Sequence, residues 1–548
     1  MLGPVFAGLA GTLAPAFGHM PAIGREDWDL SAFRALFTWP GLPEAARLSL
    51  FTGLIATVLS LAITTLILAS WHGTRIAHWV EAALSPLLAV PHAAAAFGLA
   101  FLIAPSGWIS RALSPWLTGW ERPPDLLITN DPNGLALIAG LVAKEVPFLL
   151  LMSLAALPQI HPRRCMIVAQ TLGYGRVTGW MKTIFPQLYK RIRLPVYAVL
   201  AYSMSVVDMA MILGPNTPPT LSVQIVRWSS APDLAQLLTA SAGALLQAAL
   251  VVAALALWRL AEHLARAPAR RWIGTGVRSK HDLSLRVFAL ILAAAIAIAL
   301  FGGLLGQLIW SLSGFWSFPE VLPDQLSLKT WSKQAPGMAN PALTAVIIAG
   351  TATAMAVLLT IACLEAETRL GLYPGRKAML LLYLPLLIPQ VSFLPGLRVL
   401  LVQVGIGVHL WPVVLAHLVF VLPYVFLSLS DPYRAWDTRY TRAAATLGAS
   451  PSRIFWQVRL PMLLAPILTA AAIGFAVSVA QYLPTLLVGG GRITTLTTEA
   501  LALSSGGNRR IIGAYALAQT ALVVVGFALA ILVPRLVWSN RRGMKGLA

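Results

Sequence analysis

Charged residues are scarce in this chain: Asp, Glu, Lys and Arg make up 11% of the 548 residues, whereas 58% are hydrophobic. Such a composition cannot cover a water-soluble surface, so it excludes a soluble globular protein. Cysteine is rarer still, since Cys165 and Cys363 are the two residues of this type. One pair cannot supply the clustered ligand spacing of a zinc site, and we expect two free thiols. No metal and no cofactor are expected.

Acidic residues are few as well, with 20 of them against 40 basic residues and a formal net charge of +20. A basic chain could bind nucleic acid, but these basic residues fall in alternate loops, as the positive-inside rule requires of a membrane protein. The expected cytoplasmic segments are 158–194, 263–286 and the C-terminal tail, and the expected outer loops are 19–46 and 105–132. We therefore expect both termini in the cytoplasm and no nucleic-acid partner.

The sequence also lacks a glycine-rich phosphate loop that ends in Gly-Lys-Ser or Gly-Lys-Thr. It shows no clustered set of His, Asp and Ser at one membrane depth, as an embedded enzyme would need. The chain is therefore expected not to be an enzyme. If ATP hydrolysis drives it, we expect a partner subunit to carry out that reaction.

Long apolar runs are abundant, and several reach the roughly 20 residues that a spanning helix needs. They predict an all-α polytopic membrane protein of about 12 transmembrane helices, in two tandem, parallel six-helix repeats. The first predicted span is short and is interrupted by Pro15. The predicted spans are 3–18, 47–70, 80–104, 134–157, 195–214, 236–258, 287–313, 341–364, 378–402, 410–430, 465–488 and 511–533.

The repeat is visible in the sequence as a loop that occurs twice, half a chain length apart. Gly173 and Pro186 in the first copy correspond to Gly448 and Pro461 in the second, and the spacing within each copy is the same. Apolar bias can match Leu and Ala by accident, but it does not match Gly and Pro at irregular intervals. The chain is therefore interpreted as a tandem duplication.

The duplication extends into the preceding spans, where the offset between the copies is larger. Pro91 precedes Gly98 by seven positions, and Pro389 precedes Gly396 by seven. Proline in a spanning helix frees backbone carbonyls, which neighbouring groups or a water-lined cavity must satisfy. Pro91 and Pro389 are therefore candidates to line a pathway between the halves. The alternative at each proline is a packing kink.

The second loop predicts two short helices that meet at a glycine elbow. Gly448 suits the left-handed end of the first helix, Ser450 is the expected N-cap of the second, and Pro451 fits its first position. Pro461 is expected to end the second helix. Its apolar stripe consists of Ile454, Phe455 and Val458.

The first loop repeats this arrangement, with its elbow at Gly173 and its stop at Pro186. The corresponding stripe consists of Val177, Trp180, Met181 and Ile184. Such a stripe is the right size to fit a groove of another protein. The alternative is an amphipathic helix that lies on lipid headgroups. Two copies at matched positions favour a two-fold docking surface.

The spacing of Ala-Ala, three residues, Gly, nine residues, a hydrophobic residue, any residue and Leu-Pro resembles the EAA loop of permease subunits of ATP-binding-cassette importers. The resemblance covers nearly the whole chain, as two fused modules similar to thiamine, iron(III) and polyamine permeases. It implies a coupling helix that docks on the cytoplasmic ATPase. By motif position it implies that the coupling residues are Ala169, Gly173, Pro186, Arg442, Ala443, Ala444, Gly448, Leu460 and Pro461. The apolar stripes add Trp180 and Phe455 as expected coupling residues.

The chain departs from the motif at its Glu, which is Ile167 in the first copy and Arg442 in the second. Docking by shape survives this change, whereas a salt bridge made by that Glu does not. The resemblance divides the chain into a first module, 1–262, a basic cytoplasmic linker, 263–286, and a second module, 287–548. The coupling loops are then 158–194 and 431–464.

The resemblance implies several partners: two copies of a cytoplasmic ATP-binding-cassette ATPase, an extracytoplasmic (periplasmic) solute-binding protein and the lipid bilayer. It also implies a place in the bacterial plasma (inner) membrane. The alternative from another class is an ion-coupled secondary transporter of six plus six helices. That class would use paired membrane carboxylates for the coupling ion rather than twin cytoplasmic docking loops.

Ionisable residues within predicted spans are costly and point to function. Asp208 follows the first coupling loop, and its repeat partner is Leu483, so it is a carboxylate present in one half. It is a candidate to attract a cationic solute along the pathway, and the alternative is a structural hydrogen bond to Ser205 and the backbone. Lys144 and Glu145 are expected to satisfy one another or a neighbouring helix.

Overall fold

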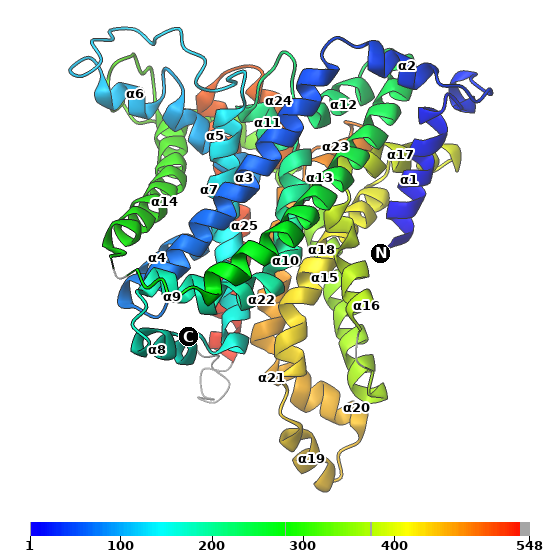
Figure 1. Cartoon of the computed structure of the whole chain (residues 1–548). Helices are drawn as coiled ribbons and strands as arrows, with labels where there is room; N and C mark the ends of the chain where they lie inside the picture. Colours follow the sequence, from blue (N-terminus) through cyan, green and yellow to red (C-terminus); the bar gives the residue numbers. More distant parts are fainter. Residues whose placement is uncertain (1, 280, 373–374, 538–548) are drawn as a thin grey trace.

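The computed structural model describes residues 2–279, 281–372 and 375–537, which fold into helices (Figure 1). In these ranges no β-strand forms, apart from isolated bridges between Met20 and Arg25 and between Ser313 and Leu326. The prediction of an all-α polytopic protein is confirmed.

The helices of the first half are α1 (Leu2–Ala16), α2 (Ser31–Thr38), α3 (Leu42–Trp71), α4 (Arg75–Leu84), α5 (His92–Ile103), α6 (Trp108–Leu113), α7 (Leu135–Ala156), α8 (Pro162–Thr171), α9 (Arg176–Thr183), α10 (Phe185–Ser205), α11 (Asp208–Leu213), α12 (Leu221–Ser229) and α13 (Ala235–Gly274). Three short 3₁₀ turns join them: η1 (Pro21–Ile23), η2 (Ser85–Ala89) and η3 (Leu157–Ile160).

The helices of the second half are α14 (Leu283–Leu312), α15 (Lys329–Leu370), α16 (Arg376–Leu387), α17 (Gln390–Gln403), α18 (Leu410–Arg434), α19 (Thr438–Thr446), α20 (Pro451–Ile454), α21 (Leu460–Met462), α22 (Leu464–Ala480), α23 (Leu483–Val488), α24 (Leu496–Ser504) and α25 (Arg509–Val537). A π-helical segment, η4 (Phe455–Arg459), lies between α20 and α21.

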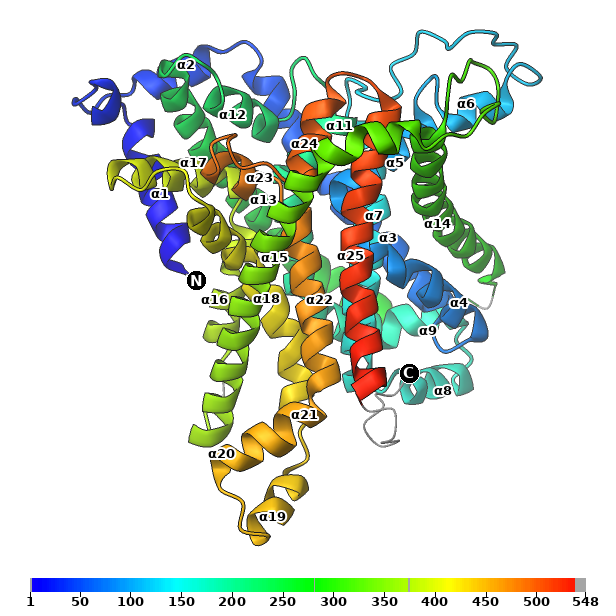
Figure 2. The same cartoon turned by 180° about the vertical axis from the view of Figure 1, so that it is seen from behind.

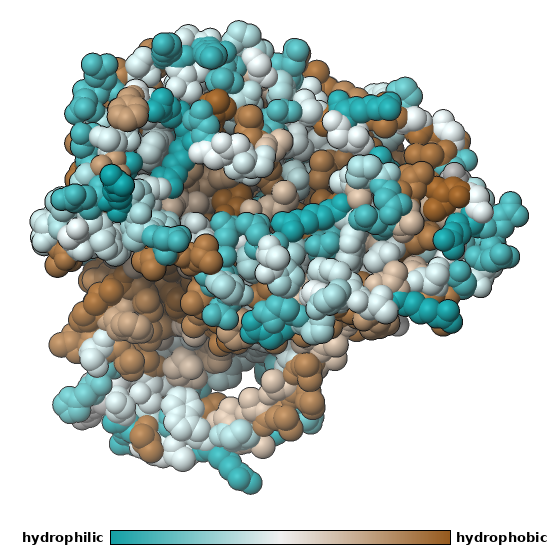
Figure 3. Space-filling view, turned by 90° about the horizontal axis from the view of Figure 1, so that it is seen from above, coloured by the Kyte–Doolittle hydropathy of each residue, from teal (hydrophilic) through white to brown (hydrophobic). Residues whose placement is uncertain are grey.

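Long helices run side by side between two ends of the molecule (Figures 1 and 2). One end carries α2, α6, α12 and α24, and the other carries α8, α9, α19 and α20. Figure 3 views the first end and shows hydrophilic residues spread across it, with hydrophobic surface mainly around the sides. This distribution is the one that a bilayer around the helices requires.

Eight of the described helices are long and apolar enough to cross a membrane, and two bent helix pairs raise the number to 10 if each pair is one span. Two of the predicted spans are not in this set. Span 3–18 is α1, an apolar helix of 15 residues. Span 195–214 is not one helix, because the chain leaves the helix at Val206 and resumes it at Asp208 as α11.

The proline-rich spans are broken at the two prolines that the sequence singles out. Pro91 and Pro389 are the N-caps of α5 and α17, so a new helix begins directly after each of them. The preceding residues, Val90 and Ile388, have extended backbones, as a following proline favours. The axis turns by 87° between α16 and α17, so span 378–402 is a bent pair rather than a continuous helix.

The halves match in their helix boundaries from the end of α10 to the end of α12. α10 ends at Ser205 and α22 at Ala480, which is the same offset as between Gly173 and Gly448. This offset also holds for both ends of α11 and α23 and for both ends of α12 and α24. The duplication therefore includes a helix break at one equivalent position in each half.

The first helix of each half packs against the other half. α1 packs on α17, and α14 packs on α5. At the first crossing, a Cβ added to Gly396 would lie 2.1 Å from the Gly8 carbonyl oxygen. At the second crossing, a Cβ added to Gly303 would lie 2.8 Å from the carbonyl carbon of Gly98. Glycine is required at both crossings because the two backbones touch.

A polar side chain beside each glycine crossing makes an equivalent hydrogen bond. The Thr12 hydroxyl donates to the Ser392 carbonyl at 3.0 Å, and the Gln307 amide donates to the Ala94 carbonyl at 2.5 Å. The two accepting residues, Ala94 and Ser392, are separated by the same offset as Pro91 and Pro389. The two crossings are therefore related by the duplication.

We predict that Gly396→Val lowers the stability of the folded protein by about 1 to 3 kcal/mol, because a side chain cannot fit between α17 and α1. The matched control is Gly350→Val, since Gly350 lies mid-span on α15 and no described atom approaches within 4 Å of an added Cβ. Thermal unfolding of both variants in detergent measures the effect. Equal unfolding midpoints for the two variants would contradict the proposed crossing.

Candidate functional site

The second coupling loop, 431–464, folds as the sequence predicts. Gly448 has a φ of 80°, in the left-handed region, and no atom of the described residues lies within 4 Å of an added Cβ. The Ser450 side chain caps the next helix by accepting from the Arg453 N–H at 3.3 Å. After Pro461 the axis bends by 68° before α22 begins. The glycine elbow, the N-cap and the proline stop are confirmed.

An aspartate caps the first helix of this loop. Asp437 accepts the backbone N–H of Arg439 at 2.9 Å, and the Arg439 guanidinium donates to it at 2.8 Å. These hydrogen bonds lower the pKa of the Asp437 carboxyl. The remainder of α19 is mostly exposed, including Arg442 and Ala443. The loop extends away from the other helices at its end of the molecule (Figure 1).

One buried ion-pair network joins the second coupling loop to the long helices. The Arg459 guanidinium, 6% exposed, donates to the Glu365 carboxylate of α15 at 2.6 Å. The same carboxylate accepts from Tyr433 of α18 at 2.5 Å and from Arg369 at 2.7 Å. One buried carboxylate therefore links this loop to both α15 and α18.

The first coupling loop, 158–194, has the same elbow but a different setting. Gly173 has a φ of 82°. The N-terminus of α9 is held by the linker, because Asp282 accepts the Val177 N–H at 2.9 Å. Lys182 of α9 donates to the Thr275 carbonyl at 2.6 Å. The predicted linker, 263–286, is therefore largely structured, with α13 extending to Gly274 and α14 beginning at Leu283.

Most of the first apolar stripe is buried and not free to dock, which corrects that part of the prediction. Trp180 is 1% exposed and Ile184 is fully buried. The Trp180 ring lies 5.4 Å from the His72 ring at the end of α3. Burial and the nearby Arg176 lower the pKa of His72. In the second copy Ile454 is 6% exposed. The first stripe therefore packs inward, whereas Phe455 and Val458 of the second stripe are half-buried.

The sequence-predicted coupling residues therefore divide by exposure. Ala169 is buried with Trp180, whereas Gly173, Pro186, Ala444, Phe455, Leu460 and Pro461 are half-buried, and Arg442, Ala443 and Gly448 are exposed.

Two exposed leucines occupy equivalent positions at the tips of the loops. Leu172 is 53% exposed and Leu447 is 87% exposed, and each directly precedes its elbow glycine. They are paired by the duplication, as the two glycines are. The repeat pairing, which aligns Leu172 with Leu447, was the signal that could have identified them.

Two buried carboxylates lie on helices that pack together beside the break between α10 and α11. Asp208, 9% exposed, is the first residue of α11, and Glu145 of α7 is 5% exposed. Ser205 donates to the Ala201 carbonyl, not to Asp208.

Lys144 satisfies the backbone that the first proline-rich break exposes. Its ammonium group donates to the Leu87 carbonyl at 2.9 Å and to the Val90 carbonyl at 2.7 Å. Of the two expectations for Lys144, a bond to a neighbouring segment is the one confirmed. Pro91 is thus beside a lysine of α7, at the place where α5 begins.

The helix break in the second half is braced by a histidine that the sequence analysis missed. His417 lies 2.8 Å from the Ser478 hydroxyl on α22 and 2.9 Å from the Thr485 hydroxyl on α23. Between them, Gln481 is 8% exposed, and neither polar atom of its side chain has a partner among the described residues. In the sequence, His417 could have been noticed as a single histidine within the apolar span 410–430.

Comparison with known proteins agrees with this arrangement. The family described as "Binding-protein-dependent transport system inner membrane component" matches residues 360–539. The inner membrane ABC transporter permease protein YnjC of Escherichia coli is 33% identical over 534 residues, which covers 96% of this chain and 94% of YnjC. The putrescine transport system permease protein PotI of Escherichia coli is 32% identical over 202 residues, 35% of this chain and 70% of PotI.

These relatives are permease subunits, and they do not favour the alternative of an ion-coupled secondary transporter. The near full-length match also accounts for both halves of the duplication. The chain therefore belongs to the family of binding-protein-dependent transport system inner membrane components, as a multi-pass inner-membrane permease of an ABC importer with two permease modules fused in one polypeptide.

Proposed function

We propose that the two modules, 1–262 and 287–548, enclose one solute pathway and that each presents one coupling loop to one copy of a cytoplasmic ATPase. An extracytoplasmic solute-binding protein delivers the solute, and the partner hydrolyses ATP. In this arrangement both termini of the chain are cytoplasmic. The observation that carries the proposal is the pair of elbow glycines with exposed leucines, at matched positions of the two halves and at one end of the molecule.

Coupling differs between the two modules. In the second module, force on the loop passes through Arg459 and Glu365 to two long helices. In the first module, the linker holds α9 through Asp282, so the loop and the linker respond as one body. The leucine tips, Leu172 and Leu447, contact the ATPase, and the buried first stripe does not.

The pathway runs beside the broken helices, where Pro91, Pro389 and Asp208 lie. Two buried carboxylates, Asp208 and Glu145, are present against one ammonium group, and Lys144 is directed to backbone carbonyls. The buried Asp208 carboxylate, which has no counterpart in the second half, favours a cationic solute.

Gly448→Val should abolish transport while leaving the protein inserted. A β-branched residue resists the left-handed conformation by about 1 to 2 kcal/mol, so the second helix of the loop is misdirected. Gly448→Asn is the matched control, because Asn tolerates that conformation and no described neighbour obstructs its side chain. Uptake in proteoliposomes with the ATPase and binding protein measures the difference. Wild-type transport by the Val variant would show that the elbow does not govern coupling.

Leu447→Ser should reduce copurification of the ATPase severalfold, because an exposed apolar tip that fills a partner's groove contributes most when fully buried there. Leu370→Ser is the matched control, since Leu370 ends α15 and is 69% exposed outside the coupling loop. ATPase retained on affinity-purified permease is quantified for both variants. Equal retention would rule out this leucine as a docking contact.

Asp208→Asn should lower uptake of a cationic solute severalfold, with expression and ATPase binding intact, because the substitution preserves shape and removes charge. The solute measured is the ligand that copurifies with the binding protein. Unchanged uptake by the Asn variant, together with loss of folded protein in Asp208→Leu, would identify Asp208 as a structural group.

A further inference from the structure

The linker between the modules folds over the first coupling helix, α9. Its residues 275–279, which we call the strap, directly follow α13 and hold the coupling loop by hydrogen bonds at two places. The Gly175 N–H donates to the Ser279 carbonyl at 3.0 Å, and the Lys182 ammonium group donates to the Thr275 carbonyl at 2.6 Å. Lys182 is 6% exposed, so the second contact is closed to solvent. The strap is therefore attached near both ends of α9.

The linker also supplies a helix cap that the sequence of the first loop lacks. In the second loop the Ser450 hydroxyl caps α20, but the repeat-paired residue of the first loop is Gly175, which has no side chain. Asp282 of the linker accepts the Val177 N–H instead, and its carboxylate lies at the positive end of the α9 dipole. Helix α9 therefore depends on the linker for a contact that α20 makes within its own loop.

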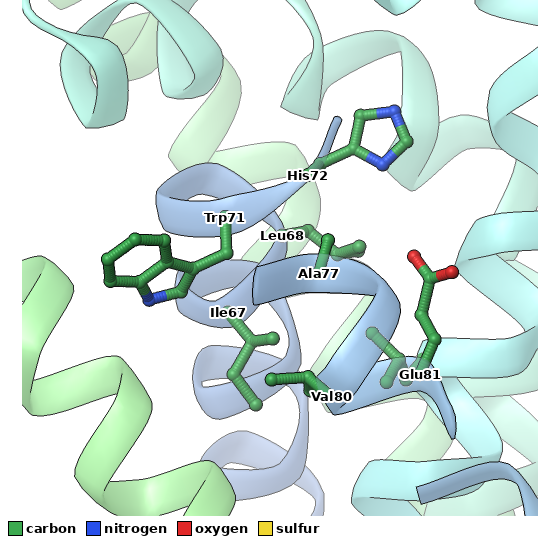
Figure 4. A pocket seen from close by; sticks show the side chains of 8 residues that line it. Ile67, Leu68, Trp71, His72, Ala77, Val80 and Glu81 are labelled. Atoms are coloured by element: carbon green, nitrogen blue, oxygen red, sulfur yellow. The ribbon is translucent and has the colours of Figure 1, made fainter. Parts of the chain in front are cut away.

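Helix α9 lies between the end of α3 and the strap. Trp180 packs toward His72 of α3, and Lys182, two residues later in the helix, is on the opposite side of α9 against the strap. Trp71 and His72 point in different directions from the end of α3 (Figure 4), and the Trp71 ring N–H donates to the Arg286 carbonyl at 3.1 Å. The end of α3 thus holds both α9 and the far end of the linker, and the strap covers the side of α9 that α3 leaves free.

The strap is the exposed part of this arrangement. Each of the eight residues of α9 is buried or half-buried, whereas residues 451–453 at the start of α20 are exposed. All five strap residues are exposed, and Val277 is 60% exposed. The Arg278 guanidinium lies 5.7 Å from the Tyr174 ring centroid, and its Cδ would lie 3.6 Å from a Cβ added to Gly173. A partner that reaches the first elbow therefore meets the strap before it meets α9.

We propose that the strap is part of the docking surface of the first module, with Val277 and Arg278 contacting the ATPase copy that Leu172 contacts. This assignment rests on the coupling function proposed above. The exposed valine and leucine flank the same elbow, so one partner surface that buries the leucine tip also covers the strap. In the second module the exposed start of α20 takes this place. The two ATPase copies therefore meet different surfaces, a composite one in the first module and a single loop in the second.

Protection from thiol labelling tests this composite surface. Leu172→Cys, Val277→Cys and Leu447→Cys are introduced separately into the full chain, with Cys165 and Cys363 replaced by Ala. Each purified variant is treated in detergent with a fluorescent maleimide, alone and with the copurifying ATPase added back. We expect the ATPase to slow labelling severalfold at all three positions, because a docked partner excludes solvent and reagent from its contacts.

The matched control is Arg266→Cys, at an exposed position of α13 in the same linker. It should be labelled at the same rate with and without the ATPase, and equal protection there would overturn the assignment of the strap. Protection at Leu172 and Leu447 without protection at Val277 would leave the coupling function standing and show that the strap is not a contact. If none of the three positions is protected, docking at the leucine tips and at the strap are both wrong.

Val277→Glu provides a second measurement of the same contact. A carboxylate that is buried without a partner is costly, so this variant should retain severalfold less ATPase on affinity-purified permease. Val277→Ile is the matched control, because it keeps an apolar side chain at the same position, and it should retain the ATPase as the wild type does. Equal retention by the Glu and Ile variants would overturn the proposed contact.

Discussion

Backbone contact between glycines is the interaction on which the two-module architecture depends. In a bilayer, helices gain little from hydrophobic burial against one another, so close packing and hydrogen bonds must hold them together. The crossings of α1 with α17 and of α14 with α5 supply both, at Gly396 and Gly98. Since each crossing joins the first helix of one module to the other module, neither module is complete alone.

The broken helices need hydrogen-bond partners from within the protein, because the membrane interior offers no water. A carbonyl released by a proline must find a donor inside the protein. Lys144 fills this role in the first module, where it bonds Leu87 and Val90. At a different break, between α22 and α23 of the second module, His417 lies within hydrogen-bond distance of hydroxyl groups on both helices. The equivalent breaks after α10 and after α22 have different polar residues beside them. The first has the carboxylate of Asp208, and the second has Gln481, whose side chain has no partner among the described residues.

The two coupling loops share one motif but contact different parts of the chain. Both contain a left-handed glycine after an exposed leucine. The first loop is held by the linker through Asp282, an element that exists because the modules are fused. The second is held through Glu365. The two loops therefore have the same elbow but different contacts with the rest of the chain.

The sequence by itself determined the helical class, the duplication, the elbow glycines and the positions of the proline breaks. These features are local: hydropathy selects a span, and Gly448 or Pro389 restricts its own backbone. Tertiary structure decided what the sequence analysis missed or reversed. Hydropathy averages over a window, so it did not detect the break after Ser205, and an apolar stripe does not reveal whether Trp180 faces a partner or its own α3. Whether Trp180 packs on α3 or on a partner depends on the tertiary arrangement of the helices, which the local sequence does not specify.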